Sequence, residues 1–206
     1  MEAILVLAAY CIGSLATSVW IGKSFYHIDV REFGSGNAGA TNTFRVLGKR
    51  AGIPVLILDI LKGCVAVALA YFSKYEPGSS GFINLEIGLG VAALIGHIFP
   101  VFAGFRGGKG VATLLGVVVC IAPAASALAL IVFLIVLFSS RIVSLSSMLA
   151  GVSFPLFLIF LLGNSNPVLT VFSVVVSALL IVTHRKNIQR LLKNQESRVN
   201  LFATRK

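Results

Sequence analysis

Three short polar stretches, residues 35–45, 96–110 and 184–190, interrupt a chain that is otherwise almost entirely apolar. Each stretch is rich in side chains that hold anionic oxygen by hydrogen bonds or by positive charge, and two of the three also carry glycine clusters. These residue types predict binding of phosphate-like groups, provided that the stretches meet on one side of a membrane. In chain order the polar side chains are Ser35, Asn37, Thr41, Asn42 and Arg45; His97, Arg106 and Lys109; and His184, Asn187 and Arg190.

The first stretch contains the letters of a GxGxxG motif at residues 34–39. No strand precedes it, so a dinucleotide-binding sheet is excluded. Gly36 and Gly39 allow backbone N–H groups to approach an anion closely, and a helix that begins near Ala40 would offer its positive end. Arg45 would add a two-pronged contact to a phosphate. The alternative is a flexible interfacial loop that only caps the helix.

The second stretch combines Arg106 and Lys109 with Gly107, Gly108 and Gly110. It is not a Walker A loop, because a glycine replaces the Ser or Thr that binds magnesium. A glycine-rich loop with one Arg and one Lys still predicts a phosphate cradle. The alternative is a basic loop that anchors the chain at the membrane surface. Glycine clustering argues against the anchor, which needs charge but no left-handed backbone.

The third stretch closes the last apolar segment. On a helix His184 and Asn187 share one face, with Arg190 three residues further on, and neither His184 nor Asn187 is a useful lipid anchor. Ser147, near the end of another apolar segment, is expected to line the same cavity. The basic residues of segment 185–206 are expected to form a cytoplasmic tail that binds the membrane surface.

Three polar side chains near or within apolar segments admit two interpretations each. His97 fits either a ligand contact or a buried contact with a neighbouring helix. Asp59 and Lys62 lie three residues apart in one apolar segment. Charges inside a membrane are functional candidates by default, but these two can also pair with each other.

The elements that must position these residues are membrane helices. Of the 206 residues 57% are hydrophobic and 12% are charged, whereas a soluble domain has about 25% charged residues. Long unbroken apolar segments predict an all-α integral membrane protein, with one membrane-embedded domain over residues 1–206. Cys11, Cys64 and Cys120 lack metal-ligand spacing, and we expect neither a metal nor another cofactor.

The apolar segment at residues 111–138 is too long for one span. Its 28 residues would form a helix of about 42 Å, against about 30 Å of hydrocarbon. Pro123 lies inside it, and proline kinks or breaks a helix. It is therefore one kinked span or two short ones, 111–121 and 124–138. The other apolar segments fall at residues 3–22, 52–73, 83–103, 142–162 and 167–183.

The distribution of charge decides between one span and two. Fifteen of the 17 Lys and Arg residues lie in four places: residues 23–50, 106–109, 141 and 185–206. Two short spans put all four places on the same side, whereas one kinked span separates them. Because basic loops stay in the cytoplasm, we predict seven transmembrane helices with the N-terminus outside and the C-terminus in the cytoplasm. All three polar stretches then face the cytoplasm.

The polar stretches, taken in order, resemble the three cytoplasmic motifs of the bacterial acyl-phosphate:glycerol-3-phosphate acyltransferase family. The matching segments are Ser35–Asn42 with Arg45, Gly96–Phe102 with Phe105–Thr113, and His184–Arg190. The resemblance covers essentially the whole chain. The family tends to have a glycine before a glutamate after the third motif, whereas Asn194-Gln195-Glu196 stands here. Asn tolerates left-handed backbone, so the function is expected to be intact, and the role of Glu196 stays open.

The resemblance implies transfer of an acyl group from acyl phosphate to the 1-hydroxyl of sn-glycerol 3-phosphate. The products are lysophosphatidic acid and phosphate, in the first acylation of phospholipid synthesis, at the cytoplasmic face of the bacterial inner membrane. The implied partners are both substrates and membrane lipids, without nucleic acid. The implied catalytic residues are Ser35, Arg45, Lys109, His184 and Asn187. The implied substrate-binding residues are Gly36, Asn37, Gly39, Thr41, Asn42, His97, Arg106, Gly107, Gly108, Gly110, Ser147 and Arg190.

Two other classes of protein share some of these features. A small transporter of an anionic or phosphorylated ligand also has short broken spans and glycine loops, but it should show repeat symmetry between its halves, and none is visible. A phosphotransferase that acts on CDP-alcohols needs several clustered aspartates for its metal, and this chain has only Asp29 and Asp59.

Overall fold

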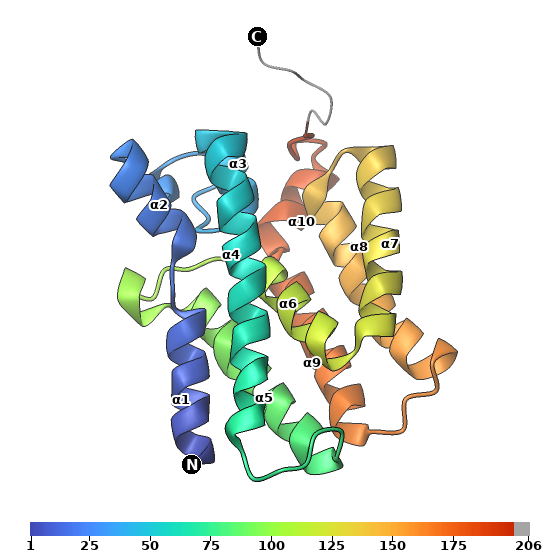
Figure 1. Ribbon diagram of the computed structural model, residues 1–206. Helices are drawn as coiled ribbons and strands as arrows, with labels where there is room; N and C mark the ends of the chain where they lie inside the picture. Colours follow the sequence, from blue (N-terminus) through green and yellow to red (C-terminus); the bar gives the residue numbers. More distant parts are fainter. Residues whose placement is uncertain (200–206) are drawn as a thin grey trace. The chain divides into compact units, whose positions relative to one another are not determined.

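The structure is a computed structural model that describes residues 1–199, and over that range it is all-helical, with ten α-helices and no strand. The predicted all-α class is therefore confirmed. The chain divides into two compact units, Met1–Pro123 and a second that begins at Ala124 (Figure 1). Arg205 and Lys206, which were predicted to belong to the basic tail, lie outside the described residues.

Two long helices form the centre of the first unit. α1 packs along α5, α6 packs along α4, and α4 and α5 contact each other. Because α3 leads directly into α4, the first polar stretch is tied to the centre of the unit. The helices are α1 (Glu2–Gly13), α2 (Thr17–Tyr26), α3 (Ala40–Leu47), α4 (Lys49–Ala68), α5 (Ser80–Ile98) and α6 (Val111–Ile121).

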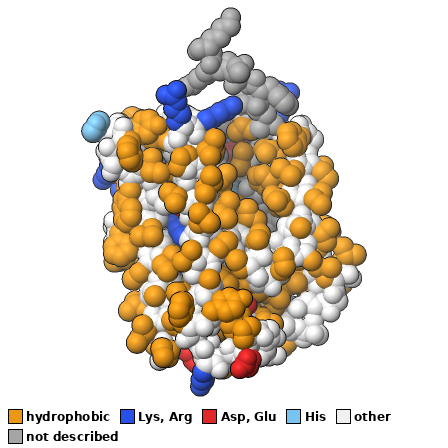
Figure 2. Space-filling model, viewed as in Figure 1, with side chains coloured by type: hydrophobic (Ala, Val, Ile, Leu, Met, Phe, Trp, Pro, Cys, Tyr) orange, Lys and Arg blue, Asp and Glu red, His pale blue; other side chains and the backbone are white. Residues whose placement is uncertain are grey.

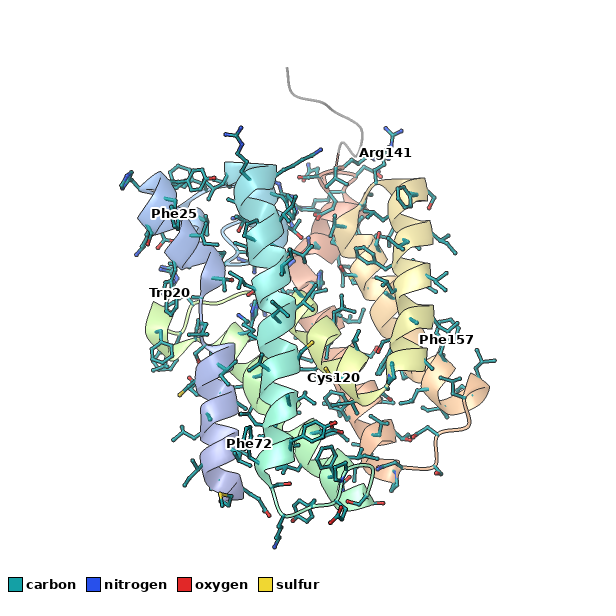
Figure 3. All side chains as sticks on the ribbon, in the orientation of Figure 1. Trp20, Phe25, Phe72, Cys120, Arg141 and Phe157 are labelled. Atoms are coloured by element: carbon teal, nitrogen blue, oxygen red, sulfur yellow. The ribbon has the colours of Figure 1, made fainter. Side chains whose placement is uncertain are left out.

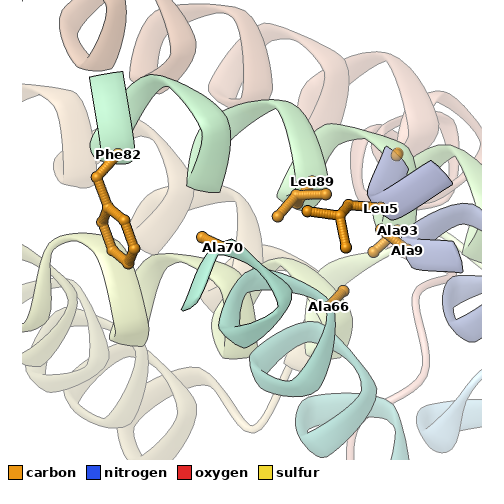
Figure 4. Close-up of a cluster of buried hydrophobic side chains, with 8 residues drawn as sticks. Leu5, Ala9, Ala66, Ala70, Phe82, Leu89 and Ala93 are labelled. Atoms are coloured by element: carbon orange, nitrogen blue, oxygen red, sulfur yellow. The ribbon is translucent and has the colours of Figure 1, made fainter. Parts of the chain in front are cut away.

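A buried apolar cluster joins α1, α4 and α5 (Figure 4). Most of its members are alanines and leucines, and alanine allows neighbouring helix backbones to approach closely. The members are Leu5, Ala9, Ala66, Ala70, Phe82, Leu89, Ala92 and Ala93.

Glycines set the closest helix crossings of this unit. A Cβ atom on Gly13 of α1 would collide with the carbonyl oxygen of Ala93 in α5, and one on Gly116 of α6 would collide with that of Ile60 in α4. Helices that leave lipid for protein gain little hydrophobic free energy, so close van der Waals contact must supply the attraction. The missing side chains at Gly13 and Gly116 permit that contact.

The second unit consists of four further α-helices. They are α7 (Pro123–Ser140), α8 (Val143–Leu156), α9 (Pro167–Thr183) and α10 (Arg185–Leu192). α8 continues into a π-helical turn, Phe157–Leu161, and packs against α9. The side-chain oxygen of Asn166 caps α9 by accepting hydrogen bonds from the N–H groups of Val168 (2.9 Å) and Leu169 (3.1 Å). This cap satisfies amides that the first turn leaves without partners.

Large apolar side chains dominate the surface seen in Figure 2. Trp20, Phe25 and Phe72, labelled in Figure 3, are 44%, 75% and 71% exposed. Exposed patches of this kind are rare on soluble proteins but suit a surface that faces lipid. The exposed side chains and the long apolar helices therefore agree on an integral membrane protein.

The predicted break inside residues 111–138 is confirmed, because α6 ends at Ile121 and α7 begins at Pro123. The prediction that both pieces are short is correct only for α6, whose 11 residues span about 16 Å. α7 has 18 residues and is long enough to cross a membrane. Within residues 1–199, four helical segments pass that test, and two bent helix pairs raise the number to six. Seven spans therefore stay a prediction.

The first apolar segment, predicted as one continuous span over residues 3–22, is broken. α1 ends at Gly13, α2 begins at Thr17, and the two helices meet at an angle of 41°. A break in an apolar segment leaves backbone groups that need hydrogen-bond partners, because the bilayer core offers no water. Local bonds satisfy some of these groups, such as the N–H of Thr17 on the carbonyl of Leu15 (3.0 Å), but Lys62 of α4 also reaches that carbonyl, and sequence periodicity gives no sign of it.

We predict that Gly116→Ala lowers the melting temperature of the purified protein in detergent. The added methyl group would force α6 away from Ile60, and overpacking of this kind costs about 1–3 kcal/mol. Gly88→Ala is the matched control, because a Cβ at Gly88 meets no atom within 4 Å. Alanine also favours a helix over glycine by up to about 1 kcal/mol, so the control should melt no lower than the wild type. Equal melting of the two variants would contradict the close α4–α6 crossing.

Candidate functional site

One buried side chain, Asn42, organises the loop before α3. Its Oδ1 atom accepts hydrogen bonds from the N–H of Ser35 (2.8 Å) and from Ser35 Oγ (3.0 Å). Its Nδ2 atom donates to the carbonyls of Val30 (2.8 Å) and Phe33 (3.1 Å). An amide side chain has two donor hydrogens and two acceptor lone pairs, and all four are used within the protein. We therefore assign Asn42 the task of fixing Ser35, in place of the predicted phosphate contact.

Left-handed backbone explains Gly34, just before the first stretch, and Gly36 within it. Gly34 and Gly36 have φ angles of 62° and 72°, which side chains with a Cβ atom rarely adopt. The N–H of Gly36 donates to the carbonyl of Phe33 (3.1 Å) rather than pointing to open space. The predicted helix start is confirmed at Ala40, where α3 begins.

Four predicted site residues of this stretch are exposed, namely Gly36 and the three with polar side chains, Ser35, Thr41 and Arg45. The stem of Arg45 lies against Gly34, since a Cβ there would be 3.4 Å from Arg45 Cδ. Asn37 folds back over Gly39 in the same way, with its Oδ1 atom 3.0 Å from the Cβ position. The exposed side chains are thus available to a ligand, whereas the amides of Ser35 and Gly36 already donate within the protein.

The glycines of the second stretch serve two different purposes. Gly104 and Gly110 have φ angles of 65° and 81°, and Gly110 precedes the first turn of α6. Gly107 and Gly108 instead permit close packing, because a Cβ on either would collide with His97. The prediction that left-handed backbone explains the whole cluster therefore holds only in part.

Two amides at the centre of this loop donate to carbonyls of the protein. The N–H of Gly107 donates to the carbonyl of Ile98 (3.2 Å), and the N–H of Gly108 donates to that of His97 (3.1 Å). These bonds satisfy carbonyls at the end of α5, which have no partners within the helix. An anion would therefore be held mainly by the side chains of Arg106 and Lys109 and by the first turn of α6.

The first and second polar stretches meet, as predicted. A Cβ on Gly108 would lie 2.9 Å from the carbonyl oxygen of Ala38. Arg31, just before the first stretch, donates to the carbonyl of Arg106 (3.1 Å) in the second. The third stretch belongs to the second unit, and its convergence with the other two stays a prediction.

The predicted Asp59–Lys62 ion pair is present and buried. Lys62 Nζ lies 2.8 Å from Asp59 Oδ1 and donates to the carbonyl of Leu15 (2.9 Å), inside the break between α1 and α2. Thr17, the first residue of α2, donates through Oγ1 to Asp59 Oδ1 (2.8 Å). The pair thus joins α4 to both sides of the break. These contacts favour the structural interpretation of the two charges.

His97 connects this buried pair to the second stretch. Its Nδ1 atom lies 3.1 Å from Thr113 Oγ1 and 3.7 Å from Asp59 Oδ1, and its Nε2 edge faces Gly108. Asp59, Lys62 and His97 line a small cavity that Ala38 and Gly107 also border. The ring is buried and packs against the loop at Gly108, and its predicted ligand contact stays a prediction.

A second polar cluster forms in the second unit around Glu196. Its Oε1 atom accepts hydrogen bonds from Asn187 Nδ2 (2.6 Å) and Ser144 Oγ (2.9 Å), and its Oε2 atom accepts one from Arg190 Nε (2.6 Å). Burial alone would raise the pKa of this carboxyl, but the hydrogen bonds from Arg190, Asn187 and Ser144 outweigh burial and lower that pKa. Glu196 is therefore a charged hub that orients the third stretch.

Two more predicted site residues of this unit, His184 and Ser147, form hydrogen bonds with backbone carbonyls of their own helices. His184 Nδ1 lies 2.8 Å from the carbonyl oxygen of Leu180. A carbonyl only accepts, so Nδ1 carries the proton and Nε2 is the basic nitrogen of the neutral ring. Ser147 Oγ donates to the carbonyl of Val143 (2.9 Å), one turn earlier on α8.

Neither Glu196 nor Arg31 is among the site residues predicted from sequence. The signal for Glu196 was a lone acid six residues after Arg190, in a segment otherwise rich in Lys and Arg. The left-handed backbone expected at Asn194 is confirmed by its φ angle of 54°. That turn brings Glu196 back toward α10.

Comparisons with known proteins agree over nearly the whole chain. A family model described as glycerol-3-phosphate acyltransferase matches residues 3–194. The glycerol-3-phosphate acyltransferase of Enterococcus faecalis is 44% identical over 204 residues, covering 96% of this chain and 91% of that protein. The one from Listeria monocytogenes is 45% identical over 196 residues, covering 95% and 96%.

Two solved structures are similar as well. One is the glycerol 3-phosphate form of PlsY (YgiH), an integral membrane glycerol 3-phosphate acyltransferase. It is 38% identical, has a TM-score of 0.87, and the match covers 98% of this chain and 99% of that one. The lysophosphatidic acid form of the same protein has a TM-score of 0.82 and the match covers 97% and 95%.

We predict that Lys62→Met strongly destabilises the protein in thermal unfolding. It leaves the Asp59 carboxylate buried without its cation, which costs about 3–5 kcal/mol. The double variant Asp59→Asn with Lys62→Met should melt at a higher temperature than Lys62→Met alone, because the buried charge is gone. Lys74→Met is the control, since Lys74 pairs with Glu2 only at the surface, at 4.0 Å. Wild-type melting of Lys62→Met would show that the pair does not hold the break.

Proposed function

The chain belongs to the glycerol-3-phosphate acyltransferase family, and we propose that it transfers an acyl group to the 1-hydroxyl of sn-glycerol 3-phosphate to give lysophosphatidic acid. The observation that carries this proposal is the end-to-end likeness to a solved membrane acyltransferase in its glycerol 3-phosphate form. The protein is accordingly an integral membrane enzyme of phospholipid synthesis.

Acyl phosphate is the donor that suits this site. A thioester donor is commonly served by a His-x4-Asp box, in which His takes the proton of the acceptor hydroxyl, and this chain lacks that box. The first two stretches instead bring Arg45, Arg106 and Lys109 into one unit. Cationic side chains of this kind stabilise a leaving phosphate and the carbonyl oxyanion.

We infer direct transfer rather than a covalent acyl-enzyme. The hydroxyl oxygen of glycerol 3-phosphate attacks the carbonyl carbon, the bond from that carbon to the phosphate oxygen breaks, and phosphate leaves. Ser35 orients substrate, because its Oγ is held by the amide oxygen of Asn42, which is not a base and cannot activate a nucleophile. The hydroxyl proton passes to a substrate phosphate oxygen or to Nε2 of His184.

The remaining site residues keep their predicted roles as proposals. Arg45 and Lys109 hold phosphate oxygens, and Arg106 supports them. His184 and Asn187 orient glycerol 3-phosphate, a role that rests on the resemblance of the third stretch to the family motif. The hydrogen bond from Asn187 to Glu196 fixes the side chain that would do so.

The proposed setting is the bacterial inner membrane, crossed seven times, with the polar stretches in the cytoplasm. Six candidate spans and the shorter α6 together make up the seven. The supporting argument is the charge distribution, because basic loops are retained in the cytoplasm.

Sidedness can be measured with single cysteines in a cysteine-free background. We expect cysteines replacing Arg50 and Lys186 to react with a membrane-impermeant maleimide only from the cytoplasmic side, and one replacing Glu76 only from outside. All three positions are exposed, so access to the reagent is not limited by burial. Labelling of position 186 from the side opposite to position 50 would rule out seven spans.

Donor choice and mechanism are tested together on the purified enzyme. We expect turnover of acyl phosphate with glycerol 3-phosphate, intersecting initial-rate lines, and no turnover of acyl-CoA or acyl carrier protein at comparable concentration. Enzyme quenched with acyl phosphate alone should carry no acyl adduct by mass spectrometry. A stoichiometric adduct on Ser35 with parallel lines would overturn direct transfer, and robust turnover of a thioester would overturn the donor assignment.

A further inference from the structure

Arg31 lies in a 3-10 turn (Val30–Glu32) between α2 and α3. Its side chain donates hydrogen bonds to backbone carbonyls of the second polar stretch. Its Nη1 atom donates to the carbonyl of Ala103 (2.7 Å) and to that of Arg106 (3.1 Å). Its other two nitrogens donate to both carboxylate oxygens of Asp29, at 2.9 Å and 2.7 Å. The Arg31 side chain is only 13% exposed, so this is not an ordinary surface ion pair.

The carboxylate fixes the direction of the guanidinium. Asp29 also accepts from the N–H of Arg31 (3.0 Å) and lies 3.3 Å from Lys23 Nζ. The hydrogen bond from Arg31 is the main cause that holds the pKa of Asp29 well below its usual range, so the pair stays ionised at neutral pH. A planar guanidinium that binds a carboxylate along one edge holds its remaining N–H groups in a fixed orientation.

The loop segment that Arg31 contacts has two backbone hydrogen bonds of its own, from the N–H groups of Ala103 (3.1 Å) and Phe105 (2.9 Å) to the carbonyl of Pro100. Between the two gripped carbonyls lie Gly104 and Phe105, both with left-handed φ angles, of 65° and 59°. For Phe105 that conformation is strained, since it carries a Cβ atom. After Arg106 the chain is held from the other side, by the bonds of Gly107 and Gly108 to the carbonyls that end α5. The backbone from Ala103 to Gly108 is thus clamped between Arg31 and α5.

We propose that Arg31 is a positioning residue for the acyl transfer, whose fork fixes the 103–108 backbone so that Arg106 and Lys109 meet a substrate phosphate. The proposal rests on the proposed function, which assigns phosphate contacts to those two side chains. Lysine cannot replace Arg31 in this task. A single ammonium group cannot grip both Asp29 oxygens and both loop carbonyls at the same time.

Hydrogen exchange and steady-state kinetics on the full-length enzyme test the proposal, with Arg31→Gln and Arg31→Lys as variants. Lys23→Gln is the matched control, because it removes the other cation at Asp29 and leaves the loop contacts in place. In Arg31→Gln we expect peptides covering 103–110 to exchange at least about tenfold faster, while peptides within 83–95 of α5 exchange as in the wild type. We also expect a raised KM for one phosphate-bearing substrate and kcat/KM about ten- to hundredfold lower.

Arg31→Lys separates loss of the loop contacts from loss of folding, in case Arg31→Gln does not fold. It should melt near the wild-type temperature, yet show faster loop exchange and reduced kcat/KM, whereas Lys23→Gln should stay within about twofold on both readouts. Wild-type behaviour of Arg31→Lys on both readouts would overturn the proposal. So would reduced activity with unchanged loop exchange, or faster loop exchange with unchanged activity.

Failure of the proposed function gives a different result. A wild-type enzyme that turns over neither acyl phosphate nor glycerol 3-phosphate would reject the acyltransferase assignment. The exchange measurement would then still decide whether Arg31 anchors the loop, because it needs no substrate.

Discussion

The arrangement of the first unit depends on a buried ion pair placed where a helix is interrupted. At the break between α1 and α2 the Leu15 carbonyl lies in an apolar environment, where buried polar groups need partners, and it accepts one local hydrogen bond from the N–H of Thr17 (3.0 Å). Lys62 donates to that carbonyl, and Asp59 neutralises the lysine while accepting from Thr17 at the start of α2. Asp59 and Lys62 therefore neutralise each other, and both bind groups at the break between α1 and α2. The interruption lets the chain change direction ahead of the first polar stretch.

In the polar loops, too, several backbone amides and one buried side chain, Asn42, make hydrogen bonds that hold the fold. The side chain of Asn42 makes four hydrogen bonds, all of them to the loop that carries Ser35. The amides of Gly107 and Gly108 close the end of α5. A glycine loop next to a helix end is therefore not automatically an anion cradle of amides. In this protein its glycines bring the loop close to His97 and Ala38.

The second unit shows how one acid can organise one basic and two polar side chains. Glu196 binds Ser144, Asn187 and Arg190 with short hydrogen bonds, and the left-handed turn at Asn194 makes the approach possible. A charged acceptor strengthens each of these bonds relative to a neutral one. Family resemblance pointed to the residues of the third stretch, but the contacts explain why Asn187 and Arg190 are oriented together.

Local sequence determined the class of the protein, its helix boundaries near proline and glycine, and the segments that carry chemistry. The break before Pro123 and the helix start at Ala40 follow from backbone preferences that act within a few residues. Composition and charge determined that this is a membrane protein, because only long apolar helices can cross the hydrocarbon core of a bilayer. Tertiary structure alone decided that the helix over residues 3–22 is interrupted and that Lys62 donates a hydrogen bond to the carbonyl of Leu15. It also decided that Arg31 grips a loop some 70 residues away. Those outcomes depend on which donor reaches which acceptor across helices, and no spacing within one segment encodes that choice.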